Sequence, residues 1–323
     1  MDSLPLEFIQ ILQAFRPLLR SEVFTSFSYL LTGLLIGEAK AGTVRASVFA
    51  PADYWPQRLS DLFCRHKLSR QAMMAKIAEV ALTHLYPHGL PPRLFWIADA
   101  TYTEKPYARR IAAVDWFHRL KYLAGRAKHL KGHCYVFAAH LYTYGEGQAQ
   151  RWASVLVGAL LYVKGRSIPT LVGTLAQQLR LPVAVRHVWL SDSGILSRPL
   201  LRALSAQGHF ALGRVRCNQN VYFAPRRPSP RQRRPRVFGQ ACRVDQVCRR
   251  FPHWLRTSPL RLRVRGRERL VQVFEAEVLL RGVRPHRALP ARLVIVVVPR
   301  LKLTPWYLLC TDLDLDPLEV VLP

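Results

Sequence analysis

The sequence predicts a mixed α/β protein whose sheet-forming part follows a helical N-terminal region. In the first 86 residues, apolar side chains recur at three- and four-residue intervals, as in Met73, Met74 and Ile77, which is the helical period. Ser69 is expected to cap the last of these helices, because serine accepts hydrogen bonds from the free amides of a first turn. From residue 94 onward, short apolar segments typical of strands alternate with helical segments. The prolines of residues 87–93 separate the two patterns, since proline removes a backbone donor and ends helices.

Four consecutive parts are expected along the chain. Residues 1–90 form the helical region, residues 91–216 carry the first part of the α/β sheet, residues 217–290 form a basic β-rich insertion, and residues 291–323 return to the sheet. A strand–helix–strand unit follows three earlier strands, so crossover connections within one mixed sheet are predicted. The expected strands lie at 94–98, 134–141, 153–163, 185–190, 210–215, 260–283 and 292–298, with helices at 169–179 and 197–206.

The charge of the chain points to a polyanionic partner. Its 323 residues include 48 Lys and Arg against 20 Asp and Glu, which leaves 48 − 20 = +28. Nucleic acid fits this excess best, because each phosphate contact made by a basic side chain releases a condensed counterion. The alternative is an arginine-rich composition inherited from a GC-rich genome. Residues 224–300 hold 20 Arg against 4 acids, and within them the Pro- and Arg-rich residues 224–236 predict an exposed loop.

Other classes of partner and compartment are disfavoured. The longest apolar run, at residues 152–163, is far shorter than the ~20 residues that span a bilayer, so no membrane partner is expected. The N-terminus has no basic segment followed by an apolar stretch, which predicts no signal peptide. Six cysteines without a CxxC pair predict neither a zinc ribbon nor a disulfide framework. A cytoplasmic protein is therefore expected.

Two aspartates follow apolar strands. Asp99 comes directly after residues 95–98, and Asp192 comes directly after residues 188–191. Ligands of open α/β sheets bind beyond the carboxyl ends of the strands, so the two carboxylates converge if their strands are neighbours. Such a pair suits Mg²⁺ or Mn²⁺, and two ions ~3.5–4 Å apart suit the chemistry of phosphodiesters. The alternative is that each aspartate caps a loop or the following helix.

The sequence around both aspartates resembles that of DDE-type insertion-sequence transposases. Residues 95–105 read Phe-Trp-Ile-Ala-Asp-Ala-Thr-Tyr-Thr-Glu-Lys, which is similar to the first-aspartate motif of that family. Residues 131–136 resemble its second strand, and residues 189–193, Trp-Leu-Ser-Asp-Ser, resemble its second-aspartate motif. Residues 210–216 resemble the strand after the next helix, and residues 306–313 the strand before the helix that bears the third acid. The resemblance covers roughly residues 24–319.

This resemblance implies an RNase H-like catalytic core with a β-rich insertion, preceded by a helical DNA-binding region. It further implies a DNA transposase, an endonuclease and strand transferase acting at insertion-sequence ends, with Asp99 and Asp192 as catalytic residues that hold two Mg²⁺ or Mn²⁺ ions. The resemblance implies that the partner is double-stranded DNA, as transposon ends and as target. It also implies a homodimer during synapsis and a location at the bacterial nucleoid in the cytoplasm. The family's third acid, a Glu after an Arg-Trp pair, is not found by Pro323, and Glu319 lies too early for it.

The chain is therefore expected to be cut off before the third acid, which a frameshifted or read-through product could supply. Two alternatives remain open: an inactive DNA-binding fragment of a transposase, and a non-enzymatic basic protein that binds nucleic acid. In either case basic side chains near the aspartates and in the insertion are expected to contact phosphates, which position a protein on DNA without reading its sequence. These are Lys105, Lys131, Arg214, Arg216, Arg226, Arg227, Arg231, Arg233, Arg234 and Arg236.

Overall fold

A computed structural model describes most of the chain, and it divides into two compact units, Met1–Gly89 and Leu90–Pro323. No helix in the described part of the chain is long and apolar enough to cross a membrane. The residues described are 5–36, 69–105, 107, 111–118, 129–145, 151–225, 237–264, 267–284, 287–299 and 304–321.

The described part of the first unit contains helices and no strands. The predicted cap is confirmed, because Ser69 Oγ accepts a hydrogen bond from the Ala72 amide at 3.3 Å. The helix that follows buries Met74, Ala78 and Leu82, which are spaced four residues apart and share one face. That this region binds DNA stays a prediction. The helical segments are α1 (Leu6–Ala14), the 3₁₀ turn η1 (Arg16–Leu18), α2 (Ser21–Ile36) and α5 (Arg70–Leu85).

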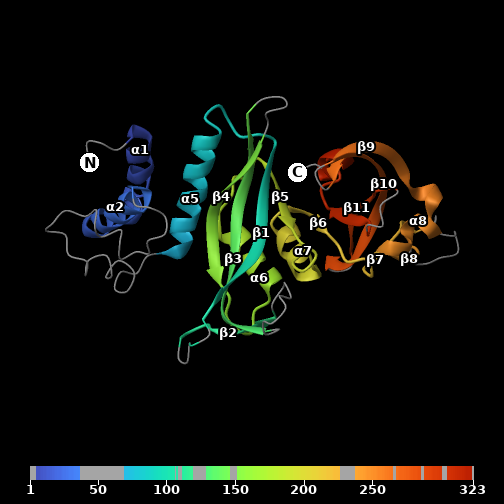
Figure 1. Cartoon of the computed structure of the whole chain (residues 1–323), viewed down its shortest axis with the longest axis horizontal. Coiled ribbons are helices and arrows are strands. Elements are labelled where there is room, and N and C mark those ends of the chain that lie inside the picture. The colour runs from blue at the N-terminus through green and yellow to red at the C-terminus, as the bar shows by residue number, and fades with distance from the viewer. Residues whose placement is uncertain are drawn as a thin grey trace. The chain divides into compact units, whose positions relative to one another are not determined.

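The second unit is built on one large sheet (Figure 1). Its order is β2-β3-β1-β5-β6-β12-β11-β10-β7-β8, with β4 paired to β3 and β9 paired to β10. The strands predicted for the insertion therefore continue the sheet instead of forming one of their own. The strands are β1 (Arg93–Glu104), β2 (Asp115–His118), β3 (His129–Tyr144), β4 (Arg151–Leu161), β5 (Arg186–Ser191), β6 (Phe210–Arg214), β7 (Asn220–Tyr222), β8 (Ala241–Arg243), β9 (Arg256–Val264), β10 (Arg267–Arg284), β11 (Arg287–Val297) and β12 (Trp306–Cys310).

The directions of the strands confirm the mixed α/β class. The strands β4, β3 and β1 are antiparallel neighbours, whereas β1, β5 and β6 are parallel neighbours. The pairs from β6 through β12 and β11 to β10 are antiparallel again, so most of the sheet is antiparallel. The parallel pairs need crossover connections, and these contain α6 (Ile168–Gln178) and α7 (Arg198–Ala206), as the sequence predicts.

Helices cover the two faces of the parallel strands. On one face α6 packs against α7 so closely that a Cβ on Gly173 would lie 2.5 Å from Ala203 Cβ, and both helices bury leucines toward the sheet. On the other face Val188 and Leu212 join a core cluster with Val320 of α9 (Pro317–Val321). Further short helical segments lie between β8 and β9: η4 (Val244–Gln246), α8 (Val247–Arg250) and η5 (Pro252–Trp254).

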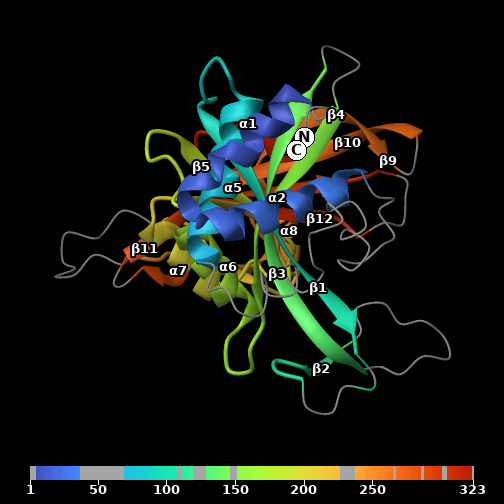
Figure 2. The ribbon, with the colours of Figure 1, turned by 90° about the vertical axis from the view of Figure 1, so that its left-hand side faces the viewer.

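The first strand is longer than predicted. Its parallel pairing with β5 ends at Ala98 and Ser191, but its antiparallel pairing with β3 continues to Glu104 and Gly132. Figure 2 shows β1 and β3 running together as a twisted pair toward β2. The expectation that the strand ends at Asp99 is therefore wrong, because hydrogen bonds from one neighbour are enough to keep the backbone extended.

Two stacked tryptophans and three histidines fill the core between the parallel strands and α6 and α7. The rings of Trp96 and Trp189, opposite one another on β1 and β5, have centroids 6.0 Å apart. Trp96 Nε1 donates to His187 Nδ1 at 3.1 Å, and His187 Nε2 lies 2.7 Å from the Pro182 carbonyl oxygen. His187 is therefore neutral with its proton on Nε2, because a second proton would displace the tryptophan donor. Burial lowers the pKa of His187, and it lowers the pKa of His140 and of His209 to about 4.

These histidines should make the second unit acid-sensitive. Their pKa values in the folded protein lie below the ordinary value of 6.5, so the unfolded chain binds protons first as the pH falls. Stability should be complete above about pH 6.5 and should fall between pH 6.5 and 4, on the order of 3 kcal/mol from His140 alone. Urea unfolding across this range measures the loss. His140→Gln should reduce it and the exposed His88→Gln should not, whereas equal stability at both ends of the range would contradict the assignment.

A buried carboxylate holds together the amino ends of β1 and β5. Asp312 is 1% exposed, and its two oxygens accept hydrogen bonds from Arg93 Nε at 3.0 Å and Arg186 Nη1 at 2.9 Å. The two arginines are register partners at the starts of their strands. Arg292 adds a hydrogen bond to the Leu313 carbonyl oxygen at 2.7 Å, which ties the same segment to β11. The turn after β12 is thereby fixed at this end of the parallel strands.

Removing this carboxylate charge should destabilise the second unit. Asp312→Asn leaves two guanidinium groups facing a neutral amide, and because both are partly exposed we expect a loss of about 2 kcal/mol, below the cost of a fully buried broken pair. Chemical denaturation measures the difference. The comparison is Asp314→Asn: the Asp314 carboxylate pairs with the same Arg186, at 2.5 Å, but it is 66% exposed and should contribute less than about 1 kcal/mol. Equal effects of the two substitutions would refute the role given to Asp312.

Candidate functional site at the carboxyl ends of the parallel strands

One row of the sheet register brings the two predicted acids together. Ala98 of β1 pairs with Ser191 of β5, and Ser191 pairs with Gly213 of β6. The next residues along these three parallel strands are Asp99, Asp192 and Arg214. Neighbouring strands lie ~4.8 Å apart, so the two aspartates follow adjacent positions at the same edge. The condition on which the prediction depends, that their strands are neighbours, is met.

Asp99 lies within β1 at the point where its parallel neighbour ends. Its side chain is exposed, and Oδ1 accepts a hydrogen bond from the Ala100 amide at 2.7 Å. Oδ2 has no hydrogen-bond donor among the residues that the structure describes. Alternation along β1 places Asp99 on the same face as Phe95, which packs against the core cluster beneath α9.

Asp192 begins the loop between β5 and α7. Its Oδ1 accepts hydrogen bonds from the amides of Gly194 at 2.9 Å and Ile195 at 3.0 Å, so one oxygen does cap the loop, as the alternative interpretation predicts. Its Oδ2 has no donor within the described ranges, and the side chain is exposed. Gly194 keeps the space beside the carboxylate open, because a Cβ there would lie 3.3 Å from Oδ1. Loop capping and a second use of Asp192 are thus compatible.

Tyr102 has a raised pKa, and the charges of Asp99 and Asp192 contribute to the increase. Burial raises the pKa of Tyr102, and the neighbouring Cys134 raises it further. The negative charges of Asp99 and Asp192 add to the same upward shift, so both carboxylates lie close enough to one phenol for their fields to act on it. Both contributions are smaller than that of burial, and they agree with the strand register, which gives the two acids neighbouring positions.

The donor chemistry of this edge fits a hard divalent cation. Asp99 and Asp192 offer oxygen ligands, which Mg²⁺ and Mn²⁺ prefer to nitrogen or sulfur. The described residues contain no group of three or more His, Cys, Asp or Glu side chains placed to hold a metal ion. Mg²⁺ sites that act on phosphates are commonly built from one or two carboxylates, with water and the substrate supplying the other ligands. Asp99 and Asp192 are therefore compatible with a Mg²⁺ site in which the substrate and water supply the remaining ligands.

The acid at the start of α9 lies elsewhere. The chain enters α9 from the segment of Asp312, at the end of the sheet opposite to Asp99 and Asp192. Glu319 is exposed in the first turn, and its Oε2 lies 3.4 Å from the amide nitrogen of Asp316. This is the arrangement of a capping box, in which a first-turn glutamate binds the amide before the helix. Glu319 thus caps the start of α9.

Four of the predicted phosphate contacts can be placed. Lys105 and Lys131 face one another across the long pair of β1 and β3, where the Lys105 amide donates to the Lys131 carbonyl oxygen at 2.8 Å. Arg214 and Arg216 are exposed at and just after the end of β6, beside Asp192 in the register. Arg214 therefore lies in the register row of Asp192, whereas Lys105 and Lys131 lie six residues further along the pair of β1 and β3 than Asp99. The remaining predicted contacts lie outside the described residues: Arg226, Arg227, Arg231, Arg233, Arg234 and Arg236.

A glycine that the sequence alone does not single out sets the spacing of this edge. A Cβ on Gly213 would lie 2.0 Å from the carbonyl oxygen of Ser191, the residue before Asp192. Any side chain at this position must therefore push β5 and β6 apart next to the aspartate. A glycine inside a strand is a known sign of close backbone approach, and it is the one signal that the sequence carries here.

No model of a known protein family matches the chain, and no curated protein sequence matches it. The site consists of two exposed carboxylates on adjacent parallel strands, with Arg214 in the same register row.

Gly213→Ala should destabilise the second unit and disturb the site. We expect a loss of about 2 kcal/mol in unfolding free energy, because the new methyl group meets backbone atoms that cannot rotate away. Urea denaturation measures it. Gly208→Ala is the control: its φ of +73° costs an alanine about 1 kcal/mol, but the added Cβ contacts nothing within 4 Å. A Gly213 variant as stable as the native chain would show that β5 and β6 can separate freely here.

Proposed function

We propose that this protein is a metal-dependent DNA nuclease and strand transferase, a transposase of the DDE type. The observation that carries the proposal is the register row that ends in Asp99 and Asp192. It places two exposed carboxylates, each with one oxygen that has no donor among the described residues, on adjacent parallel strands. Their pairing fits the two motifs whose sequence resembles that family.

The arrangement of the strands gives further support. Three antiparallel strands, β4, β3 and β1, are followed by the parallel strands β5 and β6, and helices connect β4 to β5 and β5 to β6. A mixed sheet of this kind fits the RNase H-like core that the resemblance implies, and the two acids lie where the parallel pairing of β1 and β5 ends. On this proposal β7 to β10 belong to the β-rich insertion of residues 217–290, and most of β11, together with β12 and α9, belongs to the return to the core at residues 291–323.

The residues at this edge of the sheet would have different roles in the reaction. Asp99 and Asp192 would hold Mg²⁺ or Mn²⁺ through their carboxylate oxygens. Bound there, two such ions would supply an activated oxygen nucleophile and charge stabilisation for the leaving oxygen of an in-line phosphoryl transfer. Arg214 would neutralise the phosphate next to Asp192, and its guanidinium group suits two parallel hydrogen bonds to phosphate oxygens. Lys105 and Lys131 would bind the DNA backbone beside the cleaved position without reading its sequence.

A second candidate function is a DNA-binding protein without cleavage activity. The observation that favours it is the absence, within the described ranges, of a third metal-ligating side chain near the two aspartates. The two candidates differ in their dependence on divalent cations. A nuclease of this type needs the metal for cleavage, whereas binding by basic side chains alone is limited by salt and not by metal.

Neutralising either aspartate should abolish cleavage while sparing DNA binding. The substrate is a supercoiled plasmid that carries the gene with its own flanking DNA, incubated with the full chain and Mg²⁺. We expect Asp99→Asn and Asp192→Asn each to slow nicking by about a hundredfold or more, since each removes a charged ligand at the reacting phosphate. Mn²⁺ bound to the chain, measured by electron paramagnetic resonance, should fall in the same two variants.

The matched control is Glu277→Gln, an exposed acid on β10, which should nick and bind Mn²⁺ like the native chain. Nicking that survives Asp192→Asn would exclude the assignment of the site. DNA binding by a native chain that neither nicks nor binds Mn²⁺ would favour the second candidate.

A further inference from the structure

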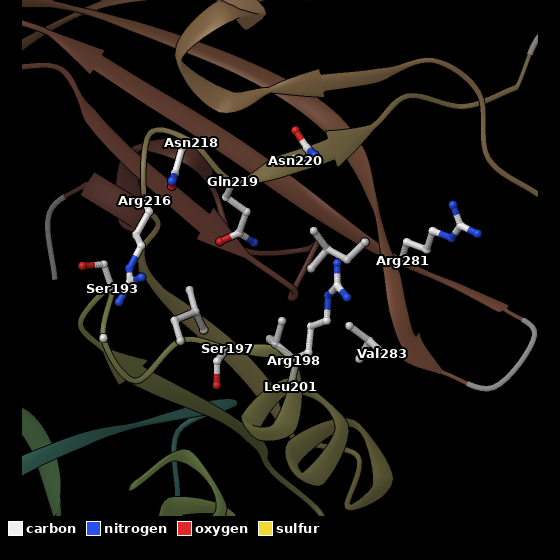
Figure 3. Close-up of a pocket in the computed structure, with 13 residues that line it drawn as sticks. Ser193, Ser197, Arg198, Leu201, Arg216, Asn218, Gln219, Asn220, Arg281 and Val283 are labelled. Carbon is white, nitrogen blue, oxygen red and sulfur yellow. The ribbon is translucent and has the colours of Figure 1, made fainter. Parts of the chain in front are cut away.

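A pocket of about 400 Å³ begins one residue beyond Asp192. Three segments that are far apart in the sequence line it: the loop from Ser193 into α7, the turn at residues 216–220 after β6, and β10 at residues 280–283. Figure 3 shows the side chains of these segments around the pocket, with Arg216 beside Ser193 and Gln219 directed toward Arg198. The pocket and the candidate catalytic edge therefore share one loop.

The far wall of the pocket is held in place by a bulge. The pairing of β10 with β11 shifts register between Leu280 and Arg284, where Gly282 has a φ of +77°. Arg202 of α7 donates to the Gly282 carbonyl oxygen at 2.8 Å, which fastens the bulge to the helix. Bulges that redirect a strand next to a site are common devices for aiming side chains. The wall is thus braced against α7 by a specific hydrogen bond.

The described residues that line the pocket include three arginines, Arg198, Arg216 and Arg281, and no acid. Neither Arg198 nor Arg216 makes a side-chain hydrogen bond or an ion pair with another residue that the structure describes. Arg281 lies at the rim, with its guanidinium carbon 5.9 Å from the centre of the Phe238 ring. Asn218 and Gln219 add neutral donors and acceptors. An anion with several oxygens is the ligand that such a lining suits.

The charge of the pocket favours one kind of phosphate. An internal phosphodiester carries a single negative charge, whereas a terminal phosphate carries about −1.5 to −2 at pH 7. Hydrolysis at the carboxylate pair would join a water oxygen to phosphorus and break the bond from phosphorus to O3′. The 3′-oxygen would leave as a hydroxyl, and a 5′-phosphate would form with release of one proton. We propose that this pocket binds a phosphate of the cleaved strand, and above all the 5′-phosphate end made beside Asp192.

That the chain itself produces this 5′-phosphate end rests on the proposed function. The affinity of the pocket for a 5′-phosphate can be measured without any cleavage. Two short single-stranded oligonucleotides of one sequence, labelled at the 3′ end, carry either a 5′-phosphate or a 5′-hydroxyl. Fluorescence anisotropy with the full chain, in the presence of EDTA, gives their affinities without cleavage. The variants are Arg198→Gln and Arg216→Gln, and the matched control is Arg261→Gln, an exposed arginine of β9 that does not line the pocket.

The native chain should bind the phosphorylated oligonucleotide about tenfold more tightly, because charge-assisted hydrogen bonds to the extra phosphate are of this strength. Both pocket variants should lose this preference and Arg261→Gln should keep it. The slope of log affinity against log salt should fall by about 0.7, because each pocket variant neutralises one phosphate fewer. An equal loss of affinity for both oligonucleotides would still support a phosphate site but would place an internal phosphodiester in it. Pocket variants that bind both oligonucleotides like the native chain would overturn the inference.

The plasmid assay separates this inference from the proposed function. If the native chain prefers the 5′-phosphate but does not nick the plasmid, the phosphate site in the pocket is supported and the proposed nuclease activity is refuted. If nicking depends on Asp192 but the chain shows no preference for the 5′-phosphate, the nuclease activity is supported and the 5′-phosphate site is refuted.

Discussion

The parallel pairing of β1, β5 and β6 in one register is the constraint on which the candidate site depends. Each of these strands ends its parallel pairing at the same row, so the residues after Ala98, Ser191 and Gly213 are brought to one edge without any direct contact between them. A slip by one residue would send Asp99 to the opposite face, because side chains alternate along a strand. The register therefore needs to be held, and different parts of the unit hold it.

Three features fix this register at different points along the strands. At the amino ends of the strands, Asp312 binds Arg93 and Arg186, which are partners in the same register as the aspartates. In the middle, the stacked rings of Trp96 and Trp189 fill the space above the sheet and leave no room for a shifted pairing. At the carboxyl ends, Gly213 permits the backbone approach that a side chain would prevent. Acid conditions should weaken the packing of the two tryptophans first, because the hydrogen bonds that Trp96 and Trp189 donate to His187 and His209 require neutral histidines.

The sequence predicts the elements of this sheet better than their extent and partners. The strands and helices between residues 94 and 215 are found within a few residues of their predicted places, because their apolar periods and flanking signals are local. The apolar pattern underestimates the length of β1, since the hydrogen bonds that extend it come from β3, some 30 residues away. The continuation of the sheet into β12, β11 and β10 depends in the same way on non-local pairing. The pocket beside Asp192 could not be predicted, because its three walls come from distant segments that a bulge brings together.

Several acids in this arginine-rich chain are paired with a basic side chain, whereas Asp99 and Asp192 are not paired with one in the part of the chain that the structure describes. Asp312, Asp245, Glu275 and Glu79 each have a Lys or Arg nitrogen within 4 Å. Asp99 and Asp192 have no such partner among the described residues, although Arg214 follows in the same register row. Glu277 of β10 is also exposed without such a partner within the described ranges, so what distinguishes Asp99 and Asp192 is their position after one register row of adjacent parallel strands. Keeping one oxygen of each acid without a protein donor costs the fold little at an exposed edge, and it preserves the oxygen ligands that a divalent cation and a phosphate would use together.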